Sequence, residues 1–155
     1  MTKAAGRKLV LAVIDGLAPS ALKEAVGRGV DVDILLPGPN ADKRVAQLAS
    51  EATYADLISA GIRVWNFQPS MLHTKVMVVD GAAALVGSSN VNRRSLDHDE
   101  EVAMVVIDHA SVGLLDQQFM EDLQRSRQID LSRWQRRSGP QRTLETAVTA
   151  IRRWL

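Results

Sequence analysis

Residues able to hold and attack an anion, chiefly His73, Lys75 and Asn90, lie at fixed offsets in the middle of the chain. His73 is followed by Lys75 and, after four more residues, by Asp80; six residues later come Gly87-Ser88 and then Asn90. A chance match of six residue types at these offsets, in a chain of 155 residues, is on the order of 10⁻⁶. An imidazole and an ammonium two residues apart favour an anion-binding site over a core position.

Attack on phosphorus is the chemistry that suits this set. Lys75 and Asn90 are placed to neutralise and hold phosphoryl oxygens, while a neutral His73 supplies the nucleophilic nitrogen. Gly87 allows the backbone to approach a ligand closely, and Ser88 adds a hydroxyl donor. These residues therefore predict a site that forms a temporary bond to phosphorus.

A nucleophilic imidazole also needs an acceptor for the proton on its other nitrogen. The acidic run that ends at Glu101 comes just before a new apolar strand. Because Glu101 opens that strand, we expect it to be the carboxylate that orients His73.

A hairpin is expected to position these groups. Residues 76–79 and 82–86 are β-favouring or apolar, and Asp80-Gly81 between them is a strong hairpin signal. Since side chains alternate faces along a strand, His73 and Lys75 are predicted to point to the same side.

The motif and its flanks resemble the phospholipase D superfamily. HTKVMVVD followed by GSSN is similar to the HxK(x)4D(x)6GSxN signature of that superfamily. The segments LLPGPNADKR, PSMLHTKVMVVDG, VGSSNVNRRS and the EEV after them resemble the C-terminal half of bacterial cardiolipin synthases. The resemblance extends from roughly Gly29 to Trp134, which is most of the chain.

The resemblance implies roles for the matching residues. The motif histidine of the superfamily becomes transiently phosphorylated, which implies the same for His73, and the motif aspartate, matched by Asp80, is usually structural. Arg94-Ser95 matches an arginine–serine pair of the family. The expected site residues are catalytic His73, Lys75, Asp80 and Glu101, and phosphate-binding Lys75, Ser88, Asn90 and Arg94. We expect no metal and no other cofactor, because a covalent intermediate divides the transfer into two steps.

The sequence contains one copy of the motif. Family enzymes bring two motifs to one site, so that one histidine attacks and the other protonates the leaving alcohol. His98 and His109 belong to no second HxK pattern. Two interpretations stay open: the chain forms a homodimer, as the single-motif nucleases of the superfamily do, or it is half of a split or truncated gene and needs a complementary half-chain. Full-length cardiolipin synthases usually carry N-terminal membrane helices, and the lack of one here favours a C-terminal half.

Strands that alternate with helices predict an α/β sandwich of the phospholipase D type, with a mixed, mostly parallel sheet flanked by helices. Residues 101–107 are apolar on both faces, so we expect a central strand covered on both sides. The other expected elements are strands 8–14, 30–36 and 62–67 and helices 19–28, 40–60, 111–127 and 141–155. Residues 1–138 are expected to form the single motif-bearing domain, and residues 139–155 a basic amphipathic C-terminal helix.

Charge is unevenly distributed along the chain. From Arg125 onward there are eight arginines and two carboxylates, although the whole chain has a net charge of +1. This basic tail favours an anionic membrane surface as a partner, and its last helix is expected to dock on the domain, contact a partner or lie in a membrane interface.

The apolar run before Asp15 is too short to span a bilayer. We therefore expect a cytoplasmic protein, peripheral at the inner face of the cell membrane. The absence of cysteine excludes disulfides and cysteine-based metal sites.

Three functions follow as hypotheses. The leading one is a phosphatidyltransferase or phosphodiesterase, similar to cardiolipin synthase, that acts on a phosphatidylglycerol-like phospholipid through a phosphohistidine. The second is a single-motif endonuclease. The residues before Arg125 carry more acidic than basic side chains, and these together with the few aromatic residues disfavour nucleic acid. The third is an inactive half-domain that binds only phosphate or a partner.

Overall fold

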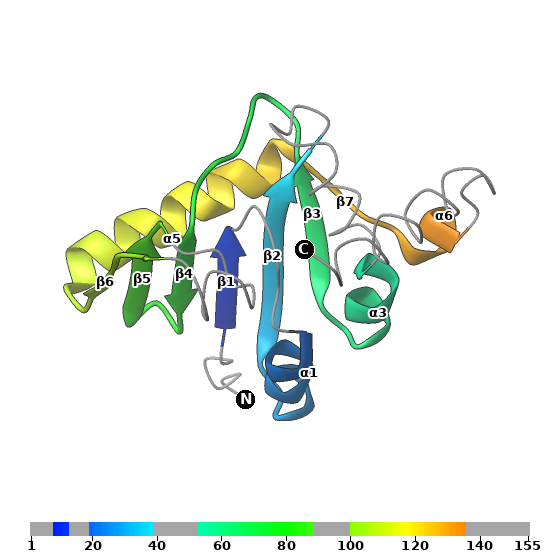
Figure 1. Cartoon of the computed structure of the whole chain (residues 1–155), viewed down its shortest axis with the longest axis horizontal. Coiled ribbons are helices and arrows are strands. Elements are labelled where there is room, and N and C mark those ends of the chain that lie inside the picture. Colours follow the sequence, from blue (N-terminus) through cyan, green and yellow to red (C-terminus); the bar gives the residue numbers. More distant parts are fainter. Residues whose placement is uncertain (1–7, 13–18, 39–52, 89–99, 136–155) are drawn as a thin grey trace, which may run out of the picture.

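The computed structural model describes residues 8–12, 19–38, 53–88 and 100–135, which form a seven-stranded sheet with helices on both faces (Figure 1). The strand order is β6-β5-β4-β1-β2-β3-β7. The strands are β1 (Lys8–Ala12), β2 (Asp31–Pro37), β3 (Arg63–Phe67), β4 (Val76–Val79), β5 (Ala83–Gly87), β6 (Ala103–Val106) and β7 (Ser126–Gln128). The helices are α1 (Pro19–Gly27), α3 (Tyr54–Ser59), α5 (His109–Gln124) and α6 (Leu131–Gln135).

The sheet is mixed, which confirms the expected α/β class. Only β1–β2 and β2–β3 pair in parallel, whereas β1–β4, β4–β5, β5–β6 and β3–β7 are antiparallel. The expectation of mostly parallel pairing is therefore wrong. Only β4 and β5 are joined by a short hairpin, whereas β1–β4 and β3–β7 pair strands that are far apart in the chain, so their direction is not set by local sequence.

Two apolar clusters lie on opposite faces of the sheet. On one face, α1 and α3 cover the middle strands, with Leu22, Leu57 and Ile34 among the buried residues. On the other face, α5 packs through Val112 and Phe119. In Figure 1, α1 and α3 lie in front of β2 and β3, and α5 runs behind the sheet. This arrangement buries the central strand β2 on both faces.

The predicted hairpin is confirmed. Asp80 and Gly81 both have positive φ, at 54° and 63°, as a tight turn between twisted antiparallel strands requires. The N–H of Ala82 donates to the carbonyl of Val79 at 2.9 Å and closes the turn. The connection joins β4 to β5 with Val79 opposite Ala83.

The expected central strand near residue 101 lies instead at the sheet edge. β6 pairs only with β5, and four of its apolar residues or neighbours are strongly exposed: Val102 at 77%, Met104 at 60%, Val105 at 66% and Ile107 at 75%. The prediction of burial on both faces is wrong. The apolar pattern shows that both faces of the segment are hydrophobic. Whether other parts of the chain bury those faces depends on where the strand lies in the sheet.

The expected helices are found with different bounds. Gly29 and Gly61 end α1 and α3 as predicted, with φ of 83° and 94°. Of the helix expected over 40–60, the structure describes Tyr54–Ser59, and residues 39–52 lie outside the described part. α5 begins at His109, where the Asp108 carboxylate caps the helix by accepting from the N–H of Ser111 at 2.8 Å. β7 and α6 were not predicted, and the helix expected at 139–155 lies outside the described residues.

Asp33 is a charged residue buried in the sheet. Its carboxylate accepts from Arg63 Nε and Nη2, both at 2.7 Å, and from Trp65 Nε1 at 2.9 Å. Burial alone would raise the pKa of Asp33, but the hydrogen bonds from Arg63 and Trp65 outweigh burial and hold this pKa below its usual range. The network joins β2 to β3.

Candidate active site

His73 and Lys75 lie in the segment that leads into β4, and they contact each other. Lys75 Nζ lies 3.3 Å from His73 Nδ1 and 3.5 Å from the His73 carbonyl oxygen. The two side chains therefore share one side, as alternation along the strand predicted. His73 is exposed to solvent and Lys75 is half-buried, so a ligand can reach both.

The surroundings of Lys75 disfavour its charged form, and a bound anion would favour it. Partial burial lowers the pKa of Lys75 below its usual value, and the negative charge of Glu101 offsets part of this shift. An ammonium carries only hydrogen-bond donors, so a contact of this kind uses Nδ1 of His73 as the acceptor. An imidazole beside a cation is a suitable pair for binding an anion and attacking it.

Ser88 and Glu101 join the ends of β5 and β6 next to this pair. The Ser88 hydroxyl donates to Glu101 Oε2 and accepts from the N–H of Val102 at 3.1 Å. The N–H of Ser88 donates to the carbonyl of Val102 at 2.9 Å. Among the described residues, the hydrogen-bond partner of Glu101 is therefore Ser88, not the His73 ring for which the sequence proposed it.

Gly87 is required by the approach of β6. A Cβ at this position would lie 2.4 Å from the carbonyl oxygen of Val102 and 2.9 Å from Cα of Ala103, closer than real Cβ atoms come. The N–H of Gly87 also donates to the carbonyl of Lys75 at 3.1 Å. The sequence suggested close approach of a ligand here, and the structure adds the neighbouring strand as a reason for the glycine.

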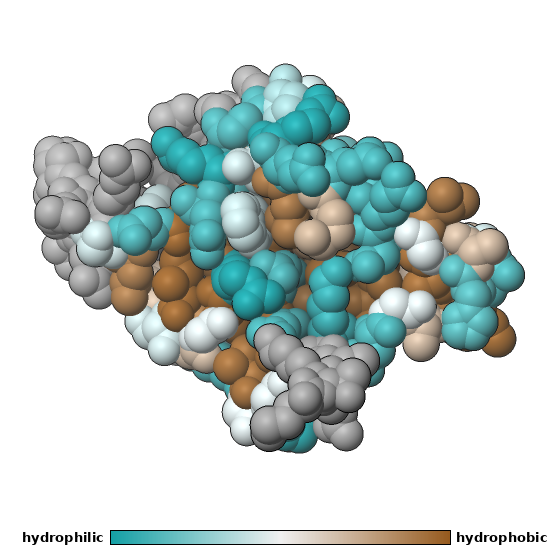
Figure 2. Space-filling view, turned by 180° about the vertical axis from the view of Figure 1, so that it is seen from behind, coloured by the Kyte–Doolittle hydropathy of each residue, from teal (hydrophilic) through white to brown (hydrophobic). Residues whose placement is uncertain are grey.

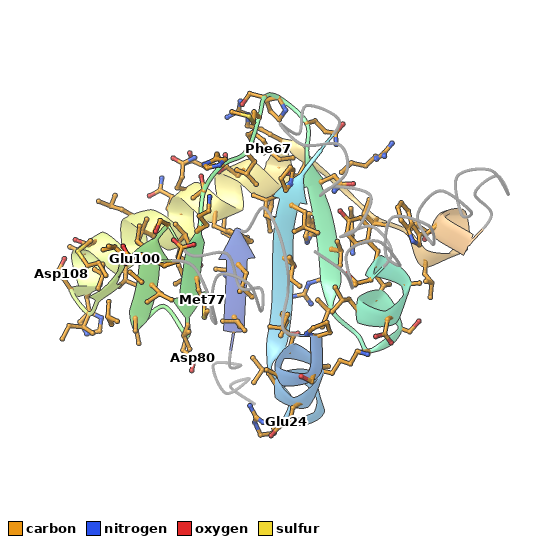
Figure 3. All side chains as sticks on the ribbon, viewed as in Figure 1. Glu24, Phe67, Met77, Asp80, Glu100 and Asp108 are labelled. Carbon is orange, nitrogen blue, oxygen red and sulfur yellow. The ribbon has the colours of Figure 1, made fainter. Side chains whose placement is uncertain are left out.

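Asp80 lies at the other end of the hairpin. Its Oδ1 accepts from the N–H of Lys8 at 2.7 Å, and its own N–H donates to the Lys8 carbonyl at 2.7 Å. Figure 3 places Asp80 at the lower end of β4, whereas the segment carrying His73 enters β4 at the upper end. Asp80 thus fastens the hairpin to β1, in agreement with the structural role that the family resemblance implied.

Lys8 is the contact that sequence reasoning missed. Besides its backbone bonds to Asp80, its Nζ donates to Asp116 of α5 at 2.8 Å. The residues in these contacts are separated by 72 and 108 positions in the chain, so no short-range signal indicates them.

The structure brings four of the expected site residues to one end of the sheet: His73, Lys75, Ser88 and Glu101. The carboxyl ends of β1 and β2 lie at the same end, since Ala12 is opposite both Val76 and Leu35. Ligands of open α/β sheets commonly bind at this edge. Asn90 and Arg94, expected to bind phosphate, lie outside the described residues.

Two absences within the described ranges bear on the site. In these ranges, no group of three or more His, Asp or Glu side chains is arranged to hold a metal ion. No helix of the same ranges combines the length and the apolar character that crossing a membrane requires.

Solved structures of similar fold define the class of fold. A phospholipase D family member, Nuc from Salmonella typhimurium, matches with a TM-score of 0.68 and 21% identity over 81% of this chain and 84% of that chain. NucT from Helicobacter pylori matches with a TM-score of 0.62 and 15% identity over 77% and 80% of the two chains. At these identities the likeness establishes the fold, which is that of a phospholipase D-type domain.

Sequence comparison then defines the family. The family described as "Cardiolipin synthase, PLD-like domain" matches residues 17–123, and the chain belongs to it. The chain is 35% identical over 132 residues to cardiolipin synthase 2 of Bacillus anthracis and 40% identical over 126 residues to cardiolipin synthase A of Klebsiella pneumoniae. The matches cover 85% and 81% of this chain but 26% of each relative, so the chain spans about a quarter of their length.

Proposed function

We propose that this domain transfers phosphatidyl groups by the phospholipase D reaction, in the manner of a cardiolipin synthase, through a covalent bond between His73 and phosphorus. The observation that carries the proposal is the contact of Lys75 Nζ with the exposed His73 ring at 3.3 Å. An anion bound by Lys75 comes to rest directly beside the imidazole.

Binding of phosphate also prepares the nucleophile. In the free site, the Lys75 ammonium faces Nδ1 of His73 and occupies its lone pair. Phosphoryl oxygens are stronger acceptors for an ammonium, because the hydrogen bond is then charge-assisted on both sides. When phosphoryl oxygens accept the hydrogen bonds of the Lys75 ammonium, the lone pair on Nδ1 of His73 becomes free to attack the phosphorus.

The reaction has two displacements. The imidazole nitrogen forms a bond to phosphorus, the bond from phosphorus to the leaving alcohol breaks, and an acid gives that alcohol its proton. The acceptor alcohol then loses a proton to the same group and attacks phosphorus, which breaks the bond to His73 and restores the free imidazole. The acid is a second imidazole, from another copy of the chain or from a complementary half.

Ser88 and Glu101 act in this scheme by position. The Ser88 hydroxyl holds the Glu101 carboxylate near Lys75, where its negative charge keeps the lysine protonated despite partial burial. A protonated Lys75 offers three donors to the phosphate. Asn90 and Arg94 are expected to add further donors.

Lipid is favoured over nucleic acid by the sequence comparisons. The relatives with 35% and 40% identity are cardiolipin synthases, whereas Nuc shares the fold at 21% identity. The same site chemistry serves any phosphodiester, so the substrate has to be tested directly.

The test incubates the full chain with phosphatidylglycerol vesicles and measures cardiolipin and free glycerol, with supercoiled plasmid as a parallel substrate. We expect lipid products and intact plasmid. His73→Ala should abolish turnover, and wild-type protein quenched with denaturant at neutral pH, where the bond from histidine to phosphorus survives, should carry a phosphatidyl adduct on the peptide containing residue 73. The matched control is His109→Ala, because His109 is also exposed but begins α5.

Each other outcome contradicts a defined part of the proposal. Turnover that survives His73→Ala excludes His73 as the nucleophile. Plasmid cleavage without lipid products makes the domain a nuclease, and inactivity on both substrates makes it a binding half-domain.

A further inference from the structure

We propose that Leu72 is a positioning residue for His73: its side chain, buried on the side of the sheet that α5 covers, holds the imidazole in contact with Lys75. The effect on turnover rests on the proposed function. The placement of His73 itself follows from burial, chain length and hydrogen bonds.

The segment 68–75, which joins β3 to β4, is longer than the distance that it crosses. β2 and β1 lie between β3 and β4 in the sheet, so the two strands are about 14 Å apart. A segment of this length reaches about 26 Å when it is extended. Figure 1 shows it arching from the upper end of β3 to the upper end of β4. Because the chain is longer than the gap, contacts along the segment must fix its course.

The start of the segment is held firmly. Phe67, the last residue of β3, is 6% exposed, and the guanidinium carbon of Arg125 lies 5.5 Å from the centre of its ring. Figure 3 places Phe67 at the upper end of the sheet. Gln68 Nε2 donates to the carbonyl of Asn66 at 2.9 Å. A Cβ on Gly38 would lie 2.0 Å from the carbonyl oxygen of Phe67, so the end of β2 closes against the same point.

Leu72 is the next fixed point along the segment. It is 6% exposed and is the one buried residue of the segment 68–75, with exposed residues on either side of it. Its side chain belongs to the apolar cluster that includes Phe119 and Leu123 of α5. Figure 2 shows this side of the molecule from behind, where hydrophilic residues are interspersed with hydrophobic ones. The segment is therefore pinned to the core immediately before His73.

Backbone pairing resumes only after His73. No backbone–backbone hydrogen bond joins residues 69–74 to another described residue, whereas the carbonyl of Lys75 accepts from the N–H of Gly87 at 3.1 Å. His73 therefore lies between two fixed points, the Leu72 side chain before it and the pairing of β4 with β5 after it. Since neighbouring side chains point to opposite sides, burial of Leu72 turns His73 away from the cluster, to the side where Lys75 Nζ lies 3.3 Å from its ring.

Loss of the Leu72 side chain should separate binding from attack. The backbone of Lys75 is held by β5, so its ammonium still binds a phosphate when Leu72 is truncated. The imidazole loses one of its two fixed points, and a displacement of about 1 Å in a reacting group costs roughly 100-fold in rate. A leucine with a purely structural role would lower stability without this selective loss.

The first experiment needs no substrate. In NMR spectra of the full chain, we expect a nuclear Overhauser effect between the ring protons of His73 and the side-chain methylene protons of Lys75. Leu72→Ala should abolish it, and Leu72→Met, which keeps the buried volume, should retain it. The matched control is Leu22→Ala. Leu22 is 7% exposed but lies on α1, in the cluster of the opposite face, so this variant should keep the effect although it also melts at a lower temperature.

The second experiment measures turnover of phosphatidylglycerol vesicles. Leu72→Ala should lower kcat about 100-fold and leave KM within about twofold of the wild-type value. Leu72→Met should recover most of kcat, and Leu22→Ala should match wild type per folded molecule. If Leu72→Ala does not fold, Leu72→Val removes less of the side chain and should lower kcat in the same selective way, by a smaller factor.

The outcomes separate the positioning role from the reaction. A folded Leu72→Ala that keeps the contact between His73 and Lys75, or that raises KM with kcat unchanged, overturns the proposal. Equal losses of kcat in Leu72→Ala and Leu22→Ala overturn it too, because they indicate a general loosening of the core. If wild type shows no turnover, the proposed function fails, and loss of the contact in Leu72→Ala but not in Leu22→Ala still supports the positioning role.

Discussion

Replacing Gly87 with alanine tests how the site is held together. The added Cβ would lie 2.4 Å from the carbonyl oxygen of Val102, whereas ordinary contact begins at 3.4 Å. Both neighbours in this contact are backbone, so β5 and β6 must separate by about 1 Å at this end. The hydrogen bonds between Ser88 and Val102, at 2.9 and 3.1 Å, would lengthen with them.

The expected cost has two parts. Overpacking of this kind lowers the free energy of unfolding by about 1–3 kcal/mol, and in a domain of this size each kcal/mol lowers the melting temperature by about 2–4 °C. The shift also carries Glu101 away from Lys75, and a displacement of about 1 Å in a catalytic group costs roughly 100-fold in rate.

The assay compares Gly87→Ala with Gly113→Ala, whose Cβ would meet nothing within 4 Å on α5. The control should raise stability by about 0.5–1 kcal/mol through higher helix propensity. Thermal unfolding measures both variants, and amide hydrogen exchange at Ser88 and Val102 reports the separation of the strands. If Gly87→Ala melts like its control and keeps slow exchange at both amides, the close approach of β6 does not explain the glycine.

Two further predictions concern residues that support the sheet. Asp80→Ala removes the acceptor for the Lys8 N–H and places alanine at a φ of 54°, so urea unfolding should show a loss of about 1–3 kcal/mol, a larger loss than for Asp80→Asn, with turnover per folded molecule unchanged. A strong loss of turnover in a stable Asp80→Asn would contradict a purely structural role. Asp33→Asn removes the ionic partner of Arg63 and should cost about 2 kcal/mol at neutral pH. Because the folded pKa of Asp33 lies below its ordinary 3.8, the wild type has this stabilisation above that value and loses it as pH falls through the folded pKa. The difference between the unfolding free energies of the two proteins should therefore shrink in acid, and a constant difference down to low pH would show that the ionised carboxylate is not the cause.

Some of the site was predictable from local sequence. The hairpin follows from a β-favouring run, an Asp80-Gly81 turn and a second run, and all three act between near neighbours in the chain. Alternation along a strand then places His73 and Lys75 together, and the 3.3 Å contact agrees with it. The α/β class follows from the same kind of pattern, since alternating strands and helices admit few arrangements.

Other features depended on contacts between distant segments. The apolar run at 101–107 was predicted to lie in the sheet centre, but β6 is an edge strand that exposes Val105. Glu101 was expected to bond His73 and bonds Ser88 instead. No short-range pattern in the sequence indicates that Asp33 contacts Arg63 or that Lys8 contacts Asp80.

The amino-acid sequence alone thus determined the hairpin and the placing of His73 beside Lys75, because both depend on spacing within a few residues, and it predicts the chemistry of the motif. Tertiary structure decided which carboxylate bonds which donor and which apolar strand is left uncovered. The hydrophobic pattern of a strand is local and indicates which of its faces are apolar. The order of strands in the sheet is set by pairing between distant segments, and this order decides which elements pack against those faces.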